Sequence, residues 1–317
     1  MRRRKSFFQR LSVLLAVAAI VFYGNTVASQ WTEVRAASEQ LHVNWLMLTA
    51  SGGIVLVSYA VLIETWRRTV TAWGEQLRWK EAARIWFVSN LGKYLPGKVW
   101  QIGAMGALAQ QAGVSPVAAI GSSLVVNLVN IVAACLVVAL ASARAVTFAG
   151  AWFVPLVALA SVAALATPWL LPVLVRLAAR LTRRDLPEPR VPPSAILVAL
   201  AGCTAGWVLY GVAFRTLTVA LFGVAAGTGA SYVAVFTFSY LIGYLYLFSP
   251  GGLGAREYVL TGALAALSLE SGAAATLLVL TSRLWLTVLE ALPGLTLLAL
   301  GRARPHHTPN PDHGPHA

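Results

Sequence analysis

Residues 89–101 read S-N-L-G-K-Y-L-P-G-K-V-W-Q, and the fold of the chain depends on this stretch. It places two lysines and a Pro-Gly pair inside a sequence that is otherwise apolar enough for a membrane. Proline removes a backbone donor and glycine permits a turn, so a helix that enters this stretch is expected to break. Residues 249–257, S-P-G-G-L-G-A-R-E, present a second Pro-Gly break in the other half. We predict two broken, partly re-entrant helices that meet near the middle of the membrane.

The composition of the chain is that of a membrane protein. Of its 317 residues, 58% are hydrophobic and 11% are charged, whereas soluble domains carry roughly 25% charged residues. Apolar runs of about 18 residues or more recur along the sequence, which is typical of membrane-spanning helices. The fold class predicted from these runs is an all-α polytopic membrane protein.

The apolar runs predict about six full spans and two broken segments. The spans are expected at 11–29, 44–63, 117–143, 152–175, 194–222 and 273–300, and the broken segments at 85–112 and 232–269. If the broken segments also cross the membrane, the count rises to eight or more. The tryptophans of the basic stretch 64–84 favour a helix lying at the membrane interface. The Pro- and His-rich residues 301–317 are predicted to form a disordered cytoplasmic tail.

The positive charges predict the orientation of the chain. The net charge is +13, but most Lys and Arg stand beside apolar runs, which argues against nucleic-acid binding. The segments assigned to the cytoplasm hold 17 of the 24 Lys and Arg, and the external loops hold two, Arg35 and Arg144. This asymmetry predicts a multi-pass protein of the inner or plasma membrane with both termini in the cytoplasm.

The two halves of the chain are expected to be related. Pro96-Gly97 recurs as Pro250-Gly251, and each half reads as a span, a broken segment and a span. The residues 1–300 are therefore predicted to form one membrane domain with inverted repeats at about 44–143 and 200–299, an arrangement common in transporters.

Charged residues at membrane depth mark the candidate site. Each broken segment restarts as a half-helix whose free N–H groups favour an anion, beside Lys93 and Lys98 in one half and Arg256 in the other. The alternative is that these cations reach the headgroup region from interfacial loops.

Further polar side chains share helix faces in the spans. Asn127 and Asn130 lie on one face with Ser123, and Arg283 and Glu290 share a face of the last span. Arg283 and Glu290 are ~10 Å apart along the axis, too far to pair directly. These faces line a polar path or form hydrogen bonds between helices. Arg215 and Glu257 are candidate partners of each other. Four tyrosines before Pro250 either contact lipid or substrate or pack in the core; they are Tyr232, Tyr240, Tyr244 and Tyr246.

The sequence around both breaks resembles the lysylphosphatidylglycerol synthase transmembrane-domain family. The resemblance rests on G-K-Y-L-P-G-K-V-W-Q at 92–101, Q-A-G-V-S at 111–115 and P-G-G-L-G-A-R-E at 250–257. It implies a flippase-like domain that moves phospholipids or lipid-linked molecules between leaflets. The substrate-binding residues expected from both motifs are Lys93, Tyr94, Pro96, Gly97, Lys98, Gln101, Pro250, Gly251, Gly252, Arg256 and Glu257. Bifunctional members carry a C-terminal aminoacyltransferase domain; since 17 residues follow Leu300, that activity is expected to be absent here.

No enzymatic motif stands out in the sequence. It shows no nucleophile elbow, zinc-protease motif or nucleotide-binding loop, so we expect no enzyme, no cofactor and no metal. The expected partners are a membrane lipid as substrate and either a second copy of the chain or a separate lipid-modifying enzyme. The alternatives are a small-anion secondary transporter, a membrane enzyme on lipid-linked substrates, and an accessory subunit.

Overall fold

The computed structural model describes Arg35, Glu39, Leu41 and the residues 43–94, 99–182, 192–246, 252 and 254–302. This part of the chain is helical and contains no strand. Its elements are α3 (Trp45–Thr71), α4 (Trp79–Asn90), the 3-10 helix η1 (Leu91–Tyr94), α5 (Val99–Gln111), α6 (Pro116–Ala141), α7 (Ala143–Ala149), α8 (Phe153–Thr182), α9 (Pro193–Phe222), α10 (Gly229–Leu245), α11 (Ala255–Ala266) and α12 (Gly272–Arg302). The predicted span at 11–29 and most of the predicted tail lie outside the described residues.

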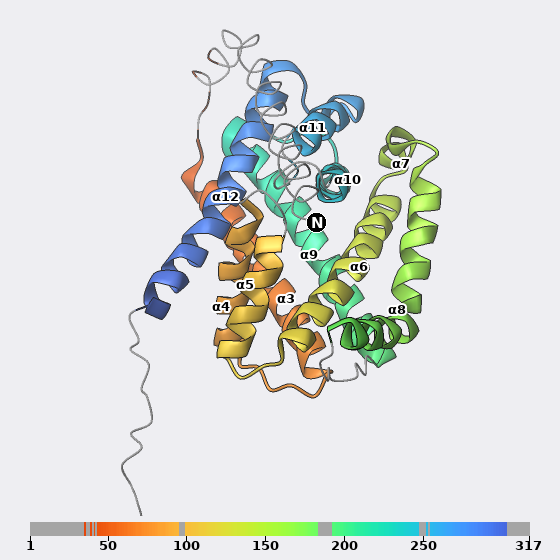
Figure 1. Ribbon diagram of the computed structural model, residues 1–317. Coiled ribbons are helices and arrows are strands. Elements are labelled where there is room, and N and C mark those ends of the chain that lie inside the picture. The colour runs from red at the N-terminus through yellow and green to blue at the C-terminus, as the bar shows by residue number, and fades with distance from the viewer. Residues whose placement is uncertain are drawn as a thin grey trace, which may run out of the picture.

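The same order of helices occurs twice (Figure 1). In the first half a long helix, α3, is followed by the short helices α4 and α5 and by a second long helix, α6. In the second half α9 is followed by α10, α11 and α12. Both predicted breaks thus fall between two short helices, which is the order of elements on which the prediction of repeats rests. The inverted relation of the halves stays a prediction.

Four of these helices are long and apolar enough to cross a membrane: α3, α6, α9 and α12. A fifth candidate is the pair of α7 with the start of α8, which is bent by 97° at a short break. The structure therefore supports a multi-pass α-helical membrane protein with four or five candidate spans in the described residues, and the predicted count of six full spans is not confirmed. The 3-10 turn and the second break keep α4, α5, α10 and α11 short.

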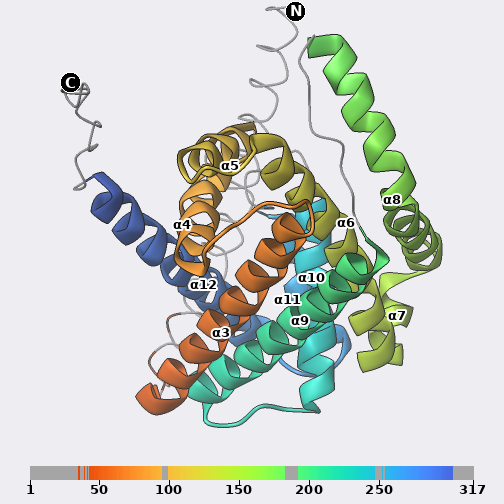
Figure 2. The ribbon, with the colours of Figure 1, turned by 90° about the horizontal axis from the view of Figure 1, so that it is seen from below.

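The centre of the bundle is the pair of α3 and α9, which lie side by side (Figure 2). Small residues let the two backbones approach: the Ser51 hydroxyl donates to the carbonyl of Ala213 at 2.8 Å, and a Cβ at Gly206 would lie 3.0 Å from Leu62. This close contact is the helix-packing use of small residues that is common in membranes. α12 and α8 flank the bundle on opposite sides (Figures 1 and 2).

No single helix covers residues 64–84, so this part of the prediction is wrong, and the position of the stretch at the membrane interface stays a prediction. α3 continues to Thr71, a turn follows, and α4 begins at Trp79. The helix continues because Glu64, which would end an apolar span, accepts hydrogen bonds from Arg67 and Arg68 at 2.7–2.8 Å. Trp66 is buried, and its indole N–H donates to the carbonyl of Ala119 in α6 at 3.3 Å.

Candidate functional site

A cavity of about 560 Å³ lies where the two broken segments meet α12. Side chains of α3, α4, α5, α6, α9, α10, α11 and α12 line it, as do Lys93 of η1 and Gly252 of the second break. Eight of the residues predicted from the sequence contribute to its wall: Lys93, Gln101, Asn127, Asn130, Gly252, Arg256, Arg283 and Glu290. The structure thus brings together side chains that are up to 197 positions apart in the chain.

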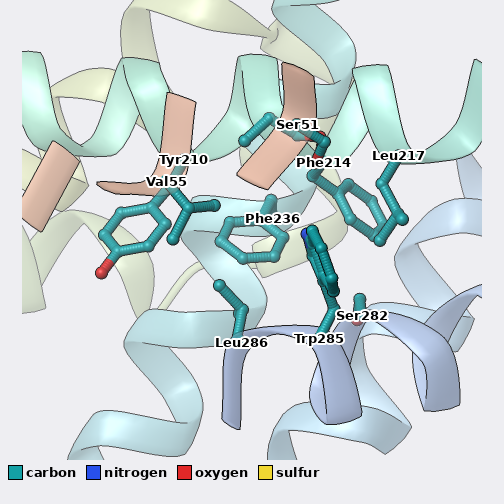
Figure 3. A pocket seen from close by; sticks show the side chains of 10 residues that line it. Ser51, Val55, Tyr210, Phe214, Leu217, Phe236, Ser282, Trp285 and Leu286 are labelled. Carbon is teal, nitrogen blue, oxygen red and sulfur yellow. The ribbon is translucent and has the colours of Figure 1, made fainter. Parts of the chain in front are cut away.

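A much smaller void adjoins this cavity between α3, α9, α10 and α12 (Figure 3). Its volume is about 10 Å³, and Tyr210 and Leu286 lie on the wall of both spaces. Apolar and aromatic side chains surround it, with Ser51 and Ser282 at its edge. A space of this size holds one water molecule at most, so it is not a site for a substrate.

The first broken segment is tied to α12 by an ion pair. α4 ends at Asn90, and the single 3-10 turn that follows directs Lys93 to the cavity wall. The Lys93 ammonium donates to the Glu290 carboxylate, whose side chain is 6% exposed. Next to this pair, the Gln101 amide donates to the side-chain oxygen of Asn90 at 2.6 Å across the break. Lys93 is therefore matched by an anion.

The second broken segment is tied to α12 by a different ion pair. Glu257 is 3% exposed, and one of its oxygens accepts the backbone N–H of Gly254 at 2.7 Å, which caps α11. The other oxygen accepts from Arg283 at 3.2 Å. Glu257 therefore supports the start of α11 from behind the cavity and is not among the residues that line it.

Arg256 is the exception among these charged groups. Its side chain lines the cavity and is 5% exposed, yet its Nη2 atom has no hydrogen-bond partner in the described part of the chain. The guanidinium carbon lies 4.4 Å from the ring centre of Tyr240 and 5.1 Å from that of Phe236, which is cation–π geometry. Gly243 makes room for it, because a Cβ there would lie 2.8 Å from the Arg256 Cβ. A buried cation without a carboxylate or a full set of acceptors is costly, and an anion in the cavity would supply both.

Seven aromatic side chains complete the wall, and sequence reasoning placed only two of them near the site. They are Tyr59, Trp66, Trp86, Trp207, Tyr210, Tyr240 and Tyr244. Their rings contact one another, for example Tyr59 and Trp86 at 5.3 Å and Trp207 and Tyr240 at 5.4 Å between centroids. Of the four tyrosines before Pro250, Tyr240 and Tyr244 line the cavity, Tyr232 is buried in the core and Tyr246 is 38% exposed. An aromatic residue in an apolar helix gives no sequence signal that separates these environments.

The pairing of the predicted residues, and those away from the cavity, complete the comparison. Glu257 pairs with Arg283, so its proposed pairing with Arg215 is wrong; Arg215 is exposed on α9. Arg283 and Glu290 pair with Glu257 and Lys93, in agreement with the expectation that they do not pair with each other. Tyr94 ends the 3-10 turn. The other predicted residues, Pro96, Gly97, Lys98, Pro250 and Gly251, lie outside the described residues, and their roles stay predictions.

The charges around the cavity leave a positive balance. Among the described residues, three cations and two carboxylates belong to this cluster, and the two ion pairs of α12 use both carboxylates. Arg256 is the cation that remains in the described part of the chain. The arrangement is therefore suited to an anionic group at Arg256.

A search of curated proteins gives no match to this sequence. The sequence model described as lysylphosphatidylglycerol synthase TM region matches residues 9–291, which include both breaks and all the residues of the cavity wall. The chain therefore belongs to the lysylphosphatidylglycerol synthase TM region family.

Proposed function

We propose that this protein translocates a phospholipid or lipid-linked anion between the two leaflets of the membrane. The observation that carries the proposal is Arg256, a buried guanidinium with an unpartnered donor on the wall of a 560 Å³ cavity. In this proposal the phosphate of the lipid binds Arg256. Charge-assisted hydrogen bonds of this kind are roughly twice as strong as neutral ones.

A lipid fits the cavity better than a soluble anion because part of its rim is apolar and exposed. Ile102 of α5, Leu124 of α6 and Leu245 of α10 line the cavity and are 36–49% exposed. Such a rim suits acyl chains that stay in the bilayer while the polar headgroup enters. A carrier of a small soluble anion would have no use for an apolar edge of this kind.

The movement proposed is alternating access around α12. Each broken segment is joined to this helix by one ion pair, Lys93–Glu290 in the first half and Glu257–Arg283 in the second. If one ion pair opens while the other stays closed, α12 moves against one half at a time. The predicted inverted repeats at 44–143 and 200–299 supply two such halves.

The setting proposed for this activity is the inner or plasma membrane, with both termini in the cytoplasm. The distribution of Lys and Arg along the sequence supports this orientation. The proposed activity is transport without chemistry, and its partners are the lipid and either a second copy of the chain or a separate lipid-modifying enzyme.

Translocation in proteoliposomes tests the proposal. A fluorescent phosphatidylglycerol is placed in both leaflets, and its exposure to an external quencher is followed with time. Arg256→Gln should lower the rate of translocation by about tenfold to a hundredfold, the equivalent of one hydrogen bond to a charged group. Arg215→Gln is the matched control, because it removes an exposed arginine of α9 away from the cavity.

Two results would contradict the proposal. An unchanged rate in Arg256→Gln, with wild-type expression and folding, would remove Arg256 from the site. Uptake of radioactive inorganic phosphate by the same liposomes, with no movement of lipid, would identify the protein as a carrier of soluble anions.

A further inference from the structure

The cavity carries a row of uncharged polar side chains on α6. Ser123, Asn127 and Asn130 stand at i, i+4 and i+7, one face of the helix, and all three line the cavity and are half-buried. Within the described part of the chain their side chains form no hydrogen bonds. They differ in this from Gln101 and Asn90, whose amides bond each other at 2.6 Å. Two amides and a hydroxyl are therefore available to a ligand.

The aromatic wall is fixed to the helix that carries this row. The Trp207 indole N–H donates to the backbone carbonyl of Asn130 at 3.1 Å, and Trp207 contacts Tyr240 at 5.4 Å between ring centres. Tyr240 in turn lies beneath the Arg256 guanidinium. A continuous path of contacts thus runs from Arg256 across two aromatic rings to the polar row of α6. A headgroup whose phosphate binds Arg256 would extend past Trp207 toward the amides.

A cationic headgroup does not match this environment. In the described part of the chain the one carboxylate that lines the cavity is Glu290, and it is bonded to Lys93. The ring face of Tyr240, which would attract an ammonium group, is already covered by Arg256. A second cation would therefore enter a region with an excess of positive charge. Amides beside aromatic ring faces suit hydroxyl groups on a carbon skeleton, because the amides donate and accept while the rings contact the C–H faces.

We propose that the cavity selects an uncharged, hydroxyl-rich headgroup, a sugar or polyol joined to the lipid through phosphate. The phosphate binds Arg256, and the hydroxyl groups bind Asn127, Asn130 and Ser123 beside the ring of Trp207. This inference rests on the proposed function and specifies the class of its substrate.

Binding of three short-chain lipids separates the possible headgroups. The purified protein is kept in amphipol, since sugar detergents would compete for the cavity, and affinities are measured from thermal stabilisation. Dioctanoyl phosphatidylinositol carries a polyol, dioctanoyl phosphatidylethanol carries the same phosphodiester charge without hydroxyls, and dioctanoyl phosphatidylcholine carries a cation. Phosphatidylinositol should bind about threefold to tenfold more tightly than phosphatidylethanol, the size of one net hydrogen bond. Phosphatidylcholine should bind most weakly.

Variants assign this difference to the polar row. Asn127→Leu should remove the preference for phosphatidylinositol over phosphatidylethanol, so that the two lipids bind with similar affinity. Gln110→Leu, an exposed amide of α5 away from the cavity, is the matched control and should keep the preference. Equal binding of phosphatidylinositol and phosphatidylethanol to the wild-type protein, or tighter binding of phosphatidylcholine, would overturn the inference. If Arg256→Gln leaves phosphatidylethanol binding unchanged, it is the proposed function that fails.

Discussion

The two broken segments each bring a cation to the same cavity but use it differently. In the first segment Lys93 is matched by Glu290 of α12. In the second segment Arg256 lies over aromatic rings, and the carboxylate next to it in sequence, Glu257, pairs with Arg283. Each half therefore holds α12 by one ion pair, and among the described residues that line the cavity Arg256 is the cation without a carboxylate.

This difference separates two roles that the sequence shows as one cluster of charge. A paired cation stabilises the packing of a helix, and its removal leaves an ionised carboxylate buried. A cation that contacts only ring faces is stabilised less than one paired with a carboxylate, and it can attract a ligand anion. The comparison predicts that substitutions at the ion pairs of α12 affect the stability of the fold, and that substitutions around Arg256 affect binding.

The largest effect on stability is expected for Arg283→Met. It leaves the Glu257 carboxyl group without its cation, on a side chain that is 4% exposed. Removal of one partner of a buried pair costs about 3–5 kcal/mol, so the apparent melting temperature in detergent should fall strongly. The double variant Arg283→Met with Glu257→Gln should recover much of this loss, because glutamine is uncharged and can still accept the N–H of Gly254.

The control for this prediction is Arg215→Met, which removes an exposed arginine of α9 and should change the stability by about 0.5 kcal/mol or less. If Arg283→Met is no less stable than this control, the Arg283–Glu257 pair does not hold α12.

A smaller loss of stability is expected for Lys93→Met. It leaves Glu290 without its cation, but the Lys93 side chain is 25% exposed and faces the cavity, so water can reach the carboxylate. The expected cost is about 1–3 kcal/mol, the range for a buried group left unsatisfied. The melting temperatures of Lys93→Met and Arg283→Met, measured together, show which of the two ion pairs contributes more to stability. A larger loss in Lys93→Met than in Arg283→Met would reverse the comparison between the segments.

Much of this architecture could be predicted from local sequence. Helix breaks, long apolar runs and glycines at close contacts are properties of a few neighbouring residues, and the predicted helices at 117–143 and 194–222 agree closely with α6 and α9. One helix over 64–84 was predicted from its tryptophans, but these lie in different environments: Trp66 is buried in α3 against α6, whereas Trp79 begins α4.

The pairing of charges could not be predicted in the same way. Sequence spacing excluded a direct Arg283–Glu290 contact, but it cannot show which distant residue faces each of them. Lys93 and Glu290 are separated by 197 positions and meet only because η1 and α12 pack together. The aromatic wall was missed for a related reason, since Tyr59 and Trp207 occur in apolar runs where a core position and a cavity position look alike.

The smallest effect is expected for the ring beneath Arg256. Tyr240→Leu removes the closer of the two aromatic faces, at 4.4 Å from the guanidinium carbon, and leaves Phe236 at 5.1 Å. The variant also changes packing, so its effect on the free energy of unfolding does not by itself measure the cation–π contact. A double-mutant cycle with Arg256→Met isolates that contact. Tyr240→Leu should lower the free energy of unfolding by about 0.5–2 kcal/mol less in the Arg256→Met background than in the wild-type protein.

Tyr240→Phe is the matched variant in this cycle, since it keeps the ring face and removes only the hydroxyl. It should keep the coupling to Arg256, whereas Tyr240→Leu should lose it. A coupling energy near zero for Tyr240→Leu would mean that the ring does not stabilise the guanidinium. The cation of the second half would then have no compensating partner in the described chain before a ligand binds, and the contrast with the paired Lys93 of the first half would become sharper.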